Sequence, residues 1–319
     1  MNLADFSGTR LLVVGDAMLD RYWFGDVSRI SPEAPVPIVK VERSEERPGG
    51  AANVARNIAA LGARVSLLSL VGDDEPGRKL KALMGDGGID AELIVDKTVA
   101  TTVKLRVIGR QQQLLRIDFE APPSNDVLLA KLSEFERRVP EFDAVVFSDY
   151  GKGGLKHVSE MILLARAAGK PVLVDPKGGD YSAYSGATVI TPNRAEMREV
   201  VGRWDDDAGL ERKAAELRGR IGVEAILVTR SEEGMSLFLD GATIHEKAVA
   251  REVYDVSGAG DTVIAALAIM LAGKSAWADA LRIANVAAGI VVGKLGTAVA
   301  SREELEAALA GVSNPTDRR

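Results

Sequence analysis

Apolar residues along most of this chain occur in short uninterrupted runs rather than in alternation with polar ones. Runs of this kind predict strands that are buried on both faces, as the central strands of a parallel sheet are. The predicted strands span 11–14, 65–71, 144–147, 172–174, 189–191 and 225–228. The predicted helices span 51–61, 125–139, 157–168, 194–201, 210–221, 262–271, 276–292 and 302–310. The alternation of the two predicts an α/β fold, in which helices flank a doubly wound, mostly parallel central sheet.

Two segments, 36–42 and 101–119, instead alternate apolar and polar residues. In the second, positions 102, 104 and 106 are polar or charged, whereas 103, 105 and 107 are apolar. Such half-exposed strands do not suit a buried parallel sheet. We therefore expect a small β-sheet lid over the carboxyl edge of the main sheet, with strands from about 17–48 and 98–120. Because no repeat or Gly/Ser linker interrupts the pattern, residues 1–319 are predicted to form a single domain.

The composition narrows the chemistry that this fold can carry. The 319 residues include no cysteine and two histidines, which excludes disulfides and thiolate nucleophiles and disfavours a multi-histidine metal site. Carboxylates, lysines, arginines and backbone amides remain. The formal net charge is −6 and no basic stripe with interleaved aromatic residues occurs, so nucleic acid is not an expected partner.

The sequence also bears on location. The first residues lack the basic and then apolar order of a signal peptide. The longest apolar run, 263–272, is shorter than the roughly 20 residues that a membrane helix needs. We expect a cytoplasmic protein without a membrane partner.

Two glycine-containing segments match phosphate-binding loops only in part. The G-K-S at 273–275 ends like a P-loop, but Ala268 stands where the first glycine should be. The G-A-G at 258–260 opens like a dinucleotide fingerprint, but Val263 stands where the third glycine should be. The second mismatch disfavours a nicotinamide-dependent dehydrogenase.

The segment D-V-S-G-A-G-D-T, residues 255–262, opens a long apolar helix. Its small residues Gly258, Ala259 and Gly260 let the backbone turn tightly and point its N–H groups at one place, where the helix dipole adds positive potential. This predicts an anion hole for the oxygens of a phosphoryl group in transfer. Asp261 would lie beside it, where a carboxylate suits removal of a proton from an attacking alcohol. The alternative is that Asp261 only caps the helix.

A second segment, P-G-G-A-A-N-V-A, covers residues 48–55. Gly49 and Gly50 permit close approach of the backbone to a ligand, and Asn53 offers both a donor and acceptors. The alternative is a strand-to-helix turn with a capping Asn.

A third segment, T-P-N-R-A-E, covers residues 191–196 and follows a predicted buried strand. Asn193 and Glu196 are three residues apart at a helix start and so lie on one face. A carboxylate near ATP phosphates usually acts through Mg²⁺ and its waters. The alternative is a capping box, in which the two side chains bond the first helical turn.

In this order and at this spacing, the three segments resemble the signatures of the ribokinase (PfkB-type) family of sugar kinases, over roughly residues 8–310. Further segments resemble the branch of that family that acts on heptose 7-phosphate: R-I-S-P-E-A-P-V-P, T-T-V-K-L-R, Q-Q-L-L-R-I-D-F-E, S-D-Y-G-K-G and V-D-P-K-G. The resemblance implies a ribokinase-like fold, ATP and Mg²⁺ as cofactors, and phosphorylation of D-glycero-β-D-manno-heptose 7-phosphate at the anomeric O1. That reaction belongs to the synthesis of ADP-heptose for lipopolysaccharide core.

The resemblance also implies roles for single residues. The base is matched by Asp261 and the anion hole by Gly258, Ala259 and Gly260. The nucleotide and its Mg²⁺ are matched by Asn193, Arg194, Ala195, Glu196, Thr229, Gly234 and Asn285. Among these, Glu196 would act on Mg²⁺ through water and Asn285 would approach adenine. Lys177 is a further candidate, which we expect to reach the ATP phosphates.

On the sugar side, the resemblance matches Asp20, Gly49, Gly50 and Asn53. Met18 stands where the family usually has Asn, and this departure argues against recognition of simple ribose. Asp255 and Ser257 match a monovalent-cation loop of some members, so K⁺ is a further candidate cofactor.

The substrate phosphate needs cations of its own. The lid segment offers Lys104 and Arg106, among other basic residues, and the turn after the strand at 144–147 offers Lys152. We expect Arg106 and Lys104 to hold the 7-phosphate, because an arginine can bind phosphate with two hydrogen bonds. Asp149 and Asp20 would then bind sugar hydroxyls.

Alternatives stay open at this point. Another kinase of the family, of fructose-phosphate or tagatose-phosphate type, would share the motifs, and a non-catalytic sugar or nucleotide sensor could share the scaffold. A sensor has no need of a base, so Asp261 disfavours it. The half-exposed lid strands predict a homodimer, since free strand edges tend to pair. The chain ends where kinases of this branch end, so we expect a stand-alone kinase that acts before a separate phosphatase and adenylyltransferase.

Overall fold

The structure is a computed structural model that describes residues 3, 5–110, 112–249 and 253–312. Its main sheet has the strand order β13-β12-β11-β10-β9-β8-β1-β4-β5. The strands are β1 (Arg10–Gly15), β4 (Arg64–Gly72), β5 (Asp90–Asp96), β8 (Ala144–Ser148), β9 (Val172–Asp175), β10 (Val189–Ile190), β11 (Ala225–Thr229), β12 (Met235–Leu239) and β13 (Ala242–Glu246). Neighbours from β5 to β11 are parallel, and β12 and β13 continue the sheet in antiparallel pairing.

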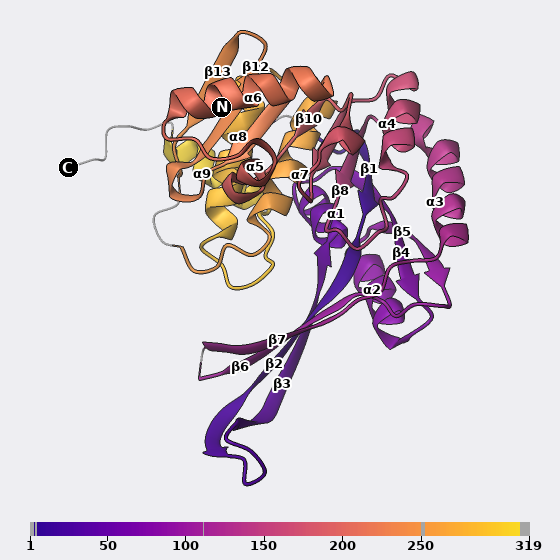
Figure 1. Cartoon of the computed structure of the whole chain (residues 1–319), viewed down its shortest axis with the longest axis vertical. Helices are drawn as coiled ribbons and strands as arrows, with labels where there is room; N and C mark the ends of the chain where they lie inside the picture. The colour runs from indigo at the N-terminus through magenta and orange to yellow at the C-terminus, as the bar shows by residue number, and fades with distance from the viewer. Residues whose placement is uncertain (1–2, 4, 111, 250–252, 313–319) are drawn as a thin grey trace, which may run out of the picture.

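Helices cover both faces of this sheet (Figure 1). One face packs against α1 (Ala51–Ala60), α2 (Glu75–Asp86), α7 (Ala259–Ala272), α8 (Trp277–Val291) and α9 (Arg302–Val312). The other packs against α3 (Asn125–Arg138), α4 (Val158–Ala167), α5 (Arg194–Val201) and α6 (Asp207–Ile221). The central strands are buried because they lie between the two layers, as their uninterrupted apolar runs indicated.

Helix α7 is the most deeply placed helix of its layer. Every residue from Asp261 to Met270 is buried. A helix that is apolar on all sides suits only a position enclosed by other elements. The N-terminus of α7, with the residues on its first turn, is therefore held in a fixed position.

The lid is a four-stranded sheet of order β3-β2-β6-β7 that extends away from the body (Figure 1). Its strands are β2 (Ala17–Ile30), β3 (Pro37–Gly50), β6 (Val103–Gly109) and β7 (Gln112–Phe119). Lys104 and Arg106 lie on one face of the lid, and Val103, Leu105 and Val107 lie on the other. The predicted lid is therefore confirmed. Strand β2 runs on almost directly from β1, so body and lid are joined by a continuous piece of chain.

The predicted doubly wound sheet is confirmed, and the predicted helices and buried strands are found within a few residues of their expected ends. The pattern missed β5, β12 and β13 and the helix α2. Helix α2 has three buried residues, Gly77, Leu80 and Met84, too few for a clear apolar periodicity. Within the described residues, no helix combines the length and apolarity needed to cross a membrane.

Candidate active site

The candidate site gathers at the carboxyl ends of the parallel strands. β1 ends at Gly15, β8 at Ser148, β9 at Asp175 and β11 at Thr229. The N-terminus of α7, with Asp261 on its first turn, belongs to the same region through its contacts with the segment after β8. This edge is where open α/β sheets bind their ligands.

Asp261 is the third residue of α7 and is 2% exposed. Its Oδ2 accepts a hydrogen bond from Asn53 Nδ2 at 2.7 Å, and its Oδ1 accepts one from the Tyr150 hydroxyl at 2.7 Å. Burial raises the pKa of the carboxyl to about 6, and the two hydrogen bonds offset part of that rise. The side chain reaches across to two other segments, so the interpretation of Asp261 as a mere helix cap is wrong.

Asn53 lies inside α1 and not at its start. Gly50 is the N-cap residue of α1, so the interpretation of Asn53 as a capping residue is also wrong. Gly258 packs against Asn53: it has a φ of 79°, and a Cβ at this position would lie 2.8 Å from Asn53 Nδ2. Both the left-handed backbone and the close approach require glycine here.

The amides at the start of α7 agree only in part with the predicted anion hole. The Ala259 N–H donates to the Val256 carbonyl at 3.2 Å, so this amide closes a turn and is not free as expected. The N–H groups of Gly258 and Gly260 have no backbone acceptor in the described part of the chain. Two of the three predicted amides therefore remain available to an anion, and they lie on a helix N-terminus.

The sugar-side candidates meet where the lid joins the body. Asp20, on β2, is 3% exposed, and its Oδ1 accepts a hydrogen bond from Arg106 Nη1 at 2.5 Å. Gly49 lies on β3 so close to Asp20 that a Cβ there would collide with the carboxylate. The predicted glycine pair thus makes room for an acid of the same site. Lys104, on β6, lies 5.2 Å from the ring centre of Tyr150.

The polar face of the lid carries several arginine side chains. The guanidinium groups of Arg47 and Arg106 each lie 5.2 Å from the ring centre of Tyr22. Arg106 and Arg116 are direct register partners on β6 and β7. Like charges opposite each other in a sheet repel, and here Asp20 and Asp118 each neutralise one of the pair.

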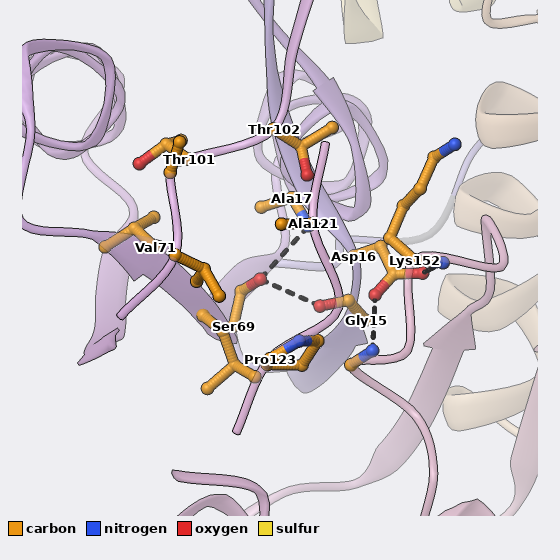
Figure 2. A pocket seen from close by; sticks show the side chains of 14 residues that line it. Gly15, Asp16, Ala17, Ser69, Val71, Thr101, Thr102, Ala121, Pro123 and Lys152 are labelled. Carbon is orange, nitrogen blue, oxygen red and sulfur yellow. Dashed lines mark hydrogen bonds between the residues drawn. The ribbon is translucent and has the colours of Figure 1, made fainter. Parts of the chain in front are cut away.

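Asp16, which the sequence analysis did not name, holds together part of the candidate site. Asp16, just after β1, accepts hydrogen bonds from the N–H groups of Tyr150, Lys152 and Gly154 at 2.9 to 3.1 Å. Figure 2 shows Asp16 beside a small pocket, bonded to the segment that carries Lys152. On another wall of the same pocket, Ser69 bonds the backbone on both sides of Asp16. Asp16 therefore fixes the path of the 149–154 segment.

Asp149 and Lys152 are less available than predicted. Asp149 accepts hydrogen bonds from Gly151 N and from the Tyr184 hydroxyl, at 2.7 and 2.8 Å. Burial is the main cause that raises its pKa. Lys152 forms an ion pair with Glu120. The structure thus gives both residues internal partners, with which a ligand would have to compete.

On the nucleotide side, Asn193 and Glu196 form the capping box that was the alternative interpretation. Asn193 Oδ1 accepts from the N–H groups of Ala195 and Glu196, and Glu196 Oε2 accepts from Asn193 N. The other oxygen, Oε1, accepts from Lys177 Nζ at 2.8 Å. The box does not exclude a ligand role, because it orients Glu196 next to Lys177 at the edge of the site.

The remaining nucleotide-side residues lie around the end of β11. Thr229 bridges to Asn193, and Arg194 Nη2 donates to the Arg230 carbonyl at 3.2 Å. Gly234 has a φ of 89°, and a Cβ there would lie 2.6 Å from Ala248 N. The first two contacts join the start of α5 to the end of β11 and the residue after it, and Gly234 packs against the segment after β13.

The side chains of two further predicted residues, Asn285 and Asp255, form hydrogen bonds with the backbone. Asn285 is 3% exposed and donates to the Lys247 carbonyl at 2.7 Å, so it supports the segment after β13 and presents little surface to adenine. Asp255 accepts from the N–H groups of Ser257 and Gly296, each at 2.9 Å. The two hydrogen bonds join the predicted cation loop to the segment after α8.

Asp175, at the end of β9, is the carboxyl that the sequence analysis missed. Burial raises its pKa well above the usual value, and the charges of Asp261 and Glu196 add to this rise. Its Oδ1 accepts a hydrogen bond from the Thr191 hydroxyl at 3.4 Å. Its position at a strand end was the available signal. Asp175 is therefore a buried acid whose neutral form is favoured, within electrostatic reach of both Asp261 and Glu196.

The donor set fits a divalent ion that is shared with phosphates. Among the described residues, no three His, Asp or Glu side chains are grouped closely enough to hold a metal on their own. Mg²⁺ usually takes one or two carboxylates and completes its shell with water and phosphate oxygens. Glu196, with oxygen donors at the edge of the site, is suited to that arrangement.

Comparison with known proteins gives consistent results. The model of the "pfkB family carbohydrate kinase" matches residues 9–304. The D-beta-D-heptose 7-phosphate kinase of Bordetella bronchiseptica is 56% identical over 93% of this chain and 95% of its own length. The bifunctional protein HldE of Methylococcus capsulatus is 54% identical over 99% of this chain, which spans 67% of that relative.

A solved structure shares the fold at lower identity. Phosphofructokinase-2 from Escherichia coli, crystallised in complex with potassium, superposes with a TM-score of 0.81 at 21% identity. The match covers 96% of this chain and 99% of the other. At this identity the likeness establishes the arrangement of sheet, helices and lid.

Proposed function

The chain belongs to the pfkB family of carbohydrate kinases, and we propose that it transfers the γ-phosphoryl group of ATP to O1 of D-glycero-β-D-manno-heptose 7-phosphate. The products are the heptose 1,7-bisphosphate and ADP. The observation that carries the proposal is the buried carboxylate of Asp261, held beside two free amides at a helix N-terminus. The substrate is supported by the heptose 7-phosphate kinase that is 56% identical over nearly all of this chain.

In the proposed reaction, Asp261 accepts the proton of the anomeric hydroxyl as O1 forms a bond to the γ-phosphorus. The bond between that phosphorus and the bridging oxygen breaks, and ADP leaves with the bond's electron pair. The N–H groups of Gly258 and Gly260 would bind the oxygens on which negative charge builds. A pKa of about 6 leaves Asp261 largely ionised at neutral pH and still basic enough to accept the proton.

The sugar would lie between the body and the lid. We assign the 7-phosphate to Arg106 and Lys104 and the sugar hydroxyls to Asp20 and Asp149. The register of Arg106 opposite Arg116 supports a phosphate here, because two facing guanidinium groups can both donate hydrogen bonds to one anion. Arg106 would then exchange its ion pair with Asp20 for one with the substrate.

The nucleotide would lie along the start of α5 and the loop after β11. Lys177 would reach its phosphates, and Glu196 would hold Mg²⁺ through water. When bound, Mg²⁺ neutralises phosphate charge. The paired Asp255 and Ser257 loop is the candidate for K⁺, and the likeness to a phosphofructokinase-2 crystallised with potassium supports testing that ion.

The lid supplies the proposed partner, a second copy of this chain. The apolar face of the lid, opposite the face that carries Lys104 and Arg106, exposes Trp23, Leu115, Ile117 and Phe119, each at least 36% accessible to solvent. Large apolar side chains gathered on one sheet face usually mark an interface. We propose a homodimer that pairs these faces.

The product also defines what must follow. A heptose 1,7-bisphosphate becomes a nucleotide sugar only after loss of the 7-phosphate and nucleotidyl transfer to the phosphate on O1. We propose that a separate phosphatase and an adenylyltransferase act next. A cytoplasmic location would supply the ATP.

The test is a coupled assay that follows ADP release. Heptose 7-phosphate, fructose 6-phosphate and ribose are compared at equal MgATP concentration. We expect kcat/KM for heptose 7-phosphate to exceed both others by about 100-fold or more. A preference for fructose 6-phosphate would assign the chain to another sugar-phosphate kinase, and no ADP release with any sugar would favour a sensor.

A further inference from the structure

Tyr150 connects three parts of the site. Its hydroxyl donates to Asp261 Oδ1 at 2.7 Å, its ring lies 5.2 Å from Lys104 Nζ of the lid, and its N–H donates to Asp16. We infer that Tyr150 is a positioning residue that orients the carboxylate of Asp261 and links it to the lid. This inference rests on the proposed function, because it assigns Tyr150 a part in the same reaction.

The backbone of Tyr150 is rigidly held, which a positioning residue requires. Asp16 accepts from three alternate N–H groups of the 149–154 segment, starting with that of Tyr150. Gly154 packs tightly against the same carboxylate. Lys131, which is fully buried, donates to the Gly154 carbonyl at 2.9 Å. The hydroxyl therefore points at Asp261 from a fixed support.

The two donors hold the carboxylate in one plane. Asn53 occupies one oxygen and Tyr150 the other, and each carboxylate oxygen has room for a second hydrogen bond. A lone pair on either oxygen thus stays available for the sugar hydroxyl. Without Tyr150, a single hydrogen bond from Asn53 would let the carboxylate rotate about its last torsion, which is broad and weakly restricted.

The charge environment of Asp261 makes the contribution of Tyr150 measurable. Asp20 and Asp175 repel its ionised form, and Lys104 attracts it. Burial is the largest influence and raises the pKa, whereas the hydrogen bonds from Asn53 and Tyr150 lower it. Removal of the hydroxyl must therefore move the pKa of Asp261 upwards.

The test is Tyr150→Phe, which deletes the hydroxyl and keeps the ring next to Lys104. We expect kcat to fall about tenfold, KM for heptose 7-phosphate to change less than about twofold, and the acidic limb of the pH profile to rise by about one unit. The matched control is Tyr181→Phe. Tyr181 is 1% exposed, and its hydroxyl has no hydrogen-bond partner among the residues that the structure describes, so its removal should leave the rate and the pH profile unchanged.

A second readout needs no substrate. The ¹³C carboxyl resonance of Asp261, assigned by its absence from Asp261→Asn, is titrated in the wild type, Tyr150→Phe and Tyr181→Phe. An upward shift of its pKa by about one unit in Tyr150→Phe alone supports the inference. An unchanged titration overturns it. So does a lower KM with an undiminished kcat, since the hydroxyl would then be a competitor of the sugar.

The two proposals can fail separately. If the wild type does not phosphorylate heptose 7-phosphate but the carboxyl titration shifts as expected, the proposed substrate is wrong and the positioning of Asp261 by Tyr150 stands. If the wild type is active and both the titration and the pH profile of Tyr150→Phe match those of the wild type, only the inference about Tyr150 is wrong.

Discussion

The carboxylate of Asp261 is almost fully buried, and its neighbours set its pKa. Burial and the nearby acid Asp20 favour the neutral form, whereas Asn53, Tyr150 and Lys104 favour the charged one. The balance leaves the pKa about two units above the usual 3.8, at about 6. A base with this pKa takes a proton more readily than an exposed aspartate and is still ionised at neutral pH.

The pH dependence of turnover follows from that value. In the proposed reaction Asp261 must be ionised to accept the proton, so kcat/KM should be constant at neutral pH and fall as the pH drops through about 6, tenfold per unit below it. Initial rates between pH 5 and 8, at saturating MgATP, measure the limb. A limb near pH 4 would mean that the essential base is an exposed carboxylate.

Asp261→Asn keeps the size of the side chain and removes the proposed base. We expect kcat to fall by about 10²–10⁴-fold, because that is the range that a positioned base contributes. Affinity for ATP should stay within about threefold, since no nucleotide-side candidate contacts Asp261; calorimetry measures it. Retention of more than a tenth of the wild-type kcat would exclude Asp261 as the base.

Arg106→Ala tests the assigned phosphate site. We expect KM for heptose 7-phosphate to rise about tenfold or more, because a charge-assisted contact with the phosphate is lost. With heptose that lacks the 7-phosphate as substrate, kcat/KM of Arg106→Ala should differ little from that of the wild type. Arg29→Ala, at the exposed far end of β2, is the matched control. Equal losses with both sugars would assign Arg106 to supporting Asp20 instead.

At the scale of elements, the start of α7 depends on its N-cap glycine. Gly258 has a left-handed backbone and leaves space for the Asn53 amide, which in turn holds Asp261. The helix itself is buried on all sides and cannot shift to relieve a clash. Local geometry at Gly258 therefore affects the position of Asp261 through a single side chain, that of Asn53.

Gly258→Ala should consequently lower stability and activity together. We expect a loss of about 1–2 kcal/mol in the free energy of unfolding from the strained backbone alone, together with a lower kcat. Gly260→Ala is the control for stability, because a Cβ there meets no atom within 4 Å and its φ is not positive. Thermal unfolding compares the two. An unchanged Tm for Gly258→Ala would show that the turn adapts.

At the scale of the whole molecule, the lid projects from the body with a charged face and an apolar face. The charged face carries the candidate substrate ligands, and the apolar face would be an unfavourable surface in water if it stayed uncovered. Pairing of two lids would bury it and would also fix the position of each lid relative to its body.

Leu115→Glu tests this pairing. Leu115 is 53% exposed on the apolar face, so its replacement should disturb an interface more than the fold of one chain. We expect the wild type to elute at twice its mass of 33.9 kDa and the variant at the mass of one chain. Leu163→Glu, an exposed position on α4, is the control that should leave the mass unchanged. A wild type that elutes as a monomer would contradict the proposed dimer.

The sequence alone determined the architecture and the most local part of the site. Uninterrupted apolar runs marked the central strands, alternation marked the lid, and turn chemistry marked Gly258 and Asp261, because these signals depend on neighbours a few residues apart. The tertiary structure decided which distant residues complete the site. Asn53 and Tyr150 lie 208 and 111 positions from Asp261, and strand order and helix packing, which no local pattern encodes, bring them to its two oxygens.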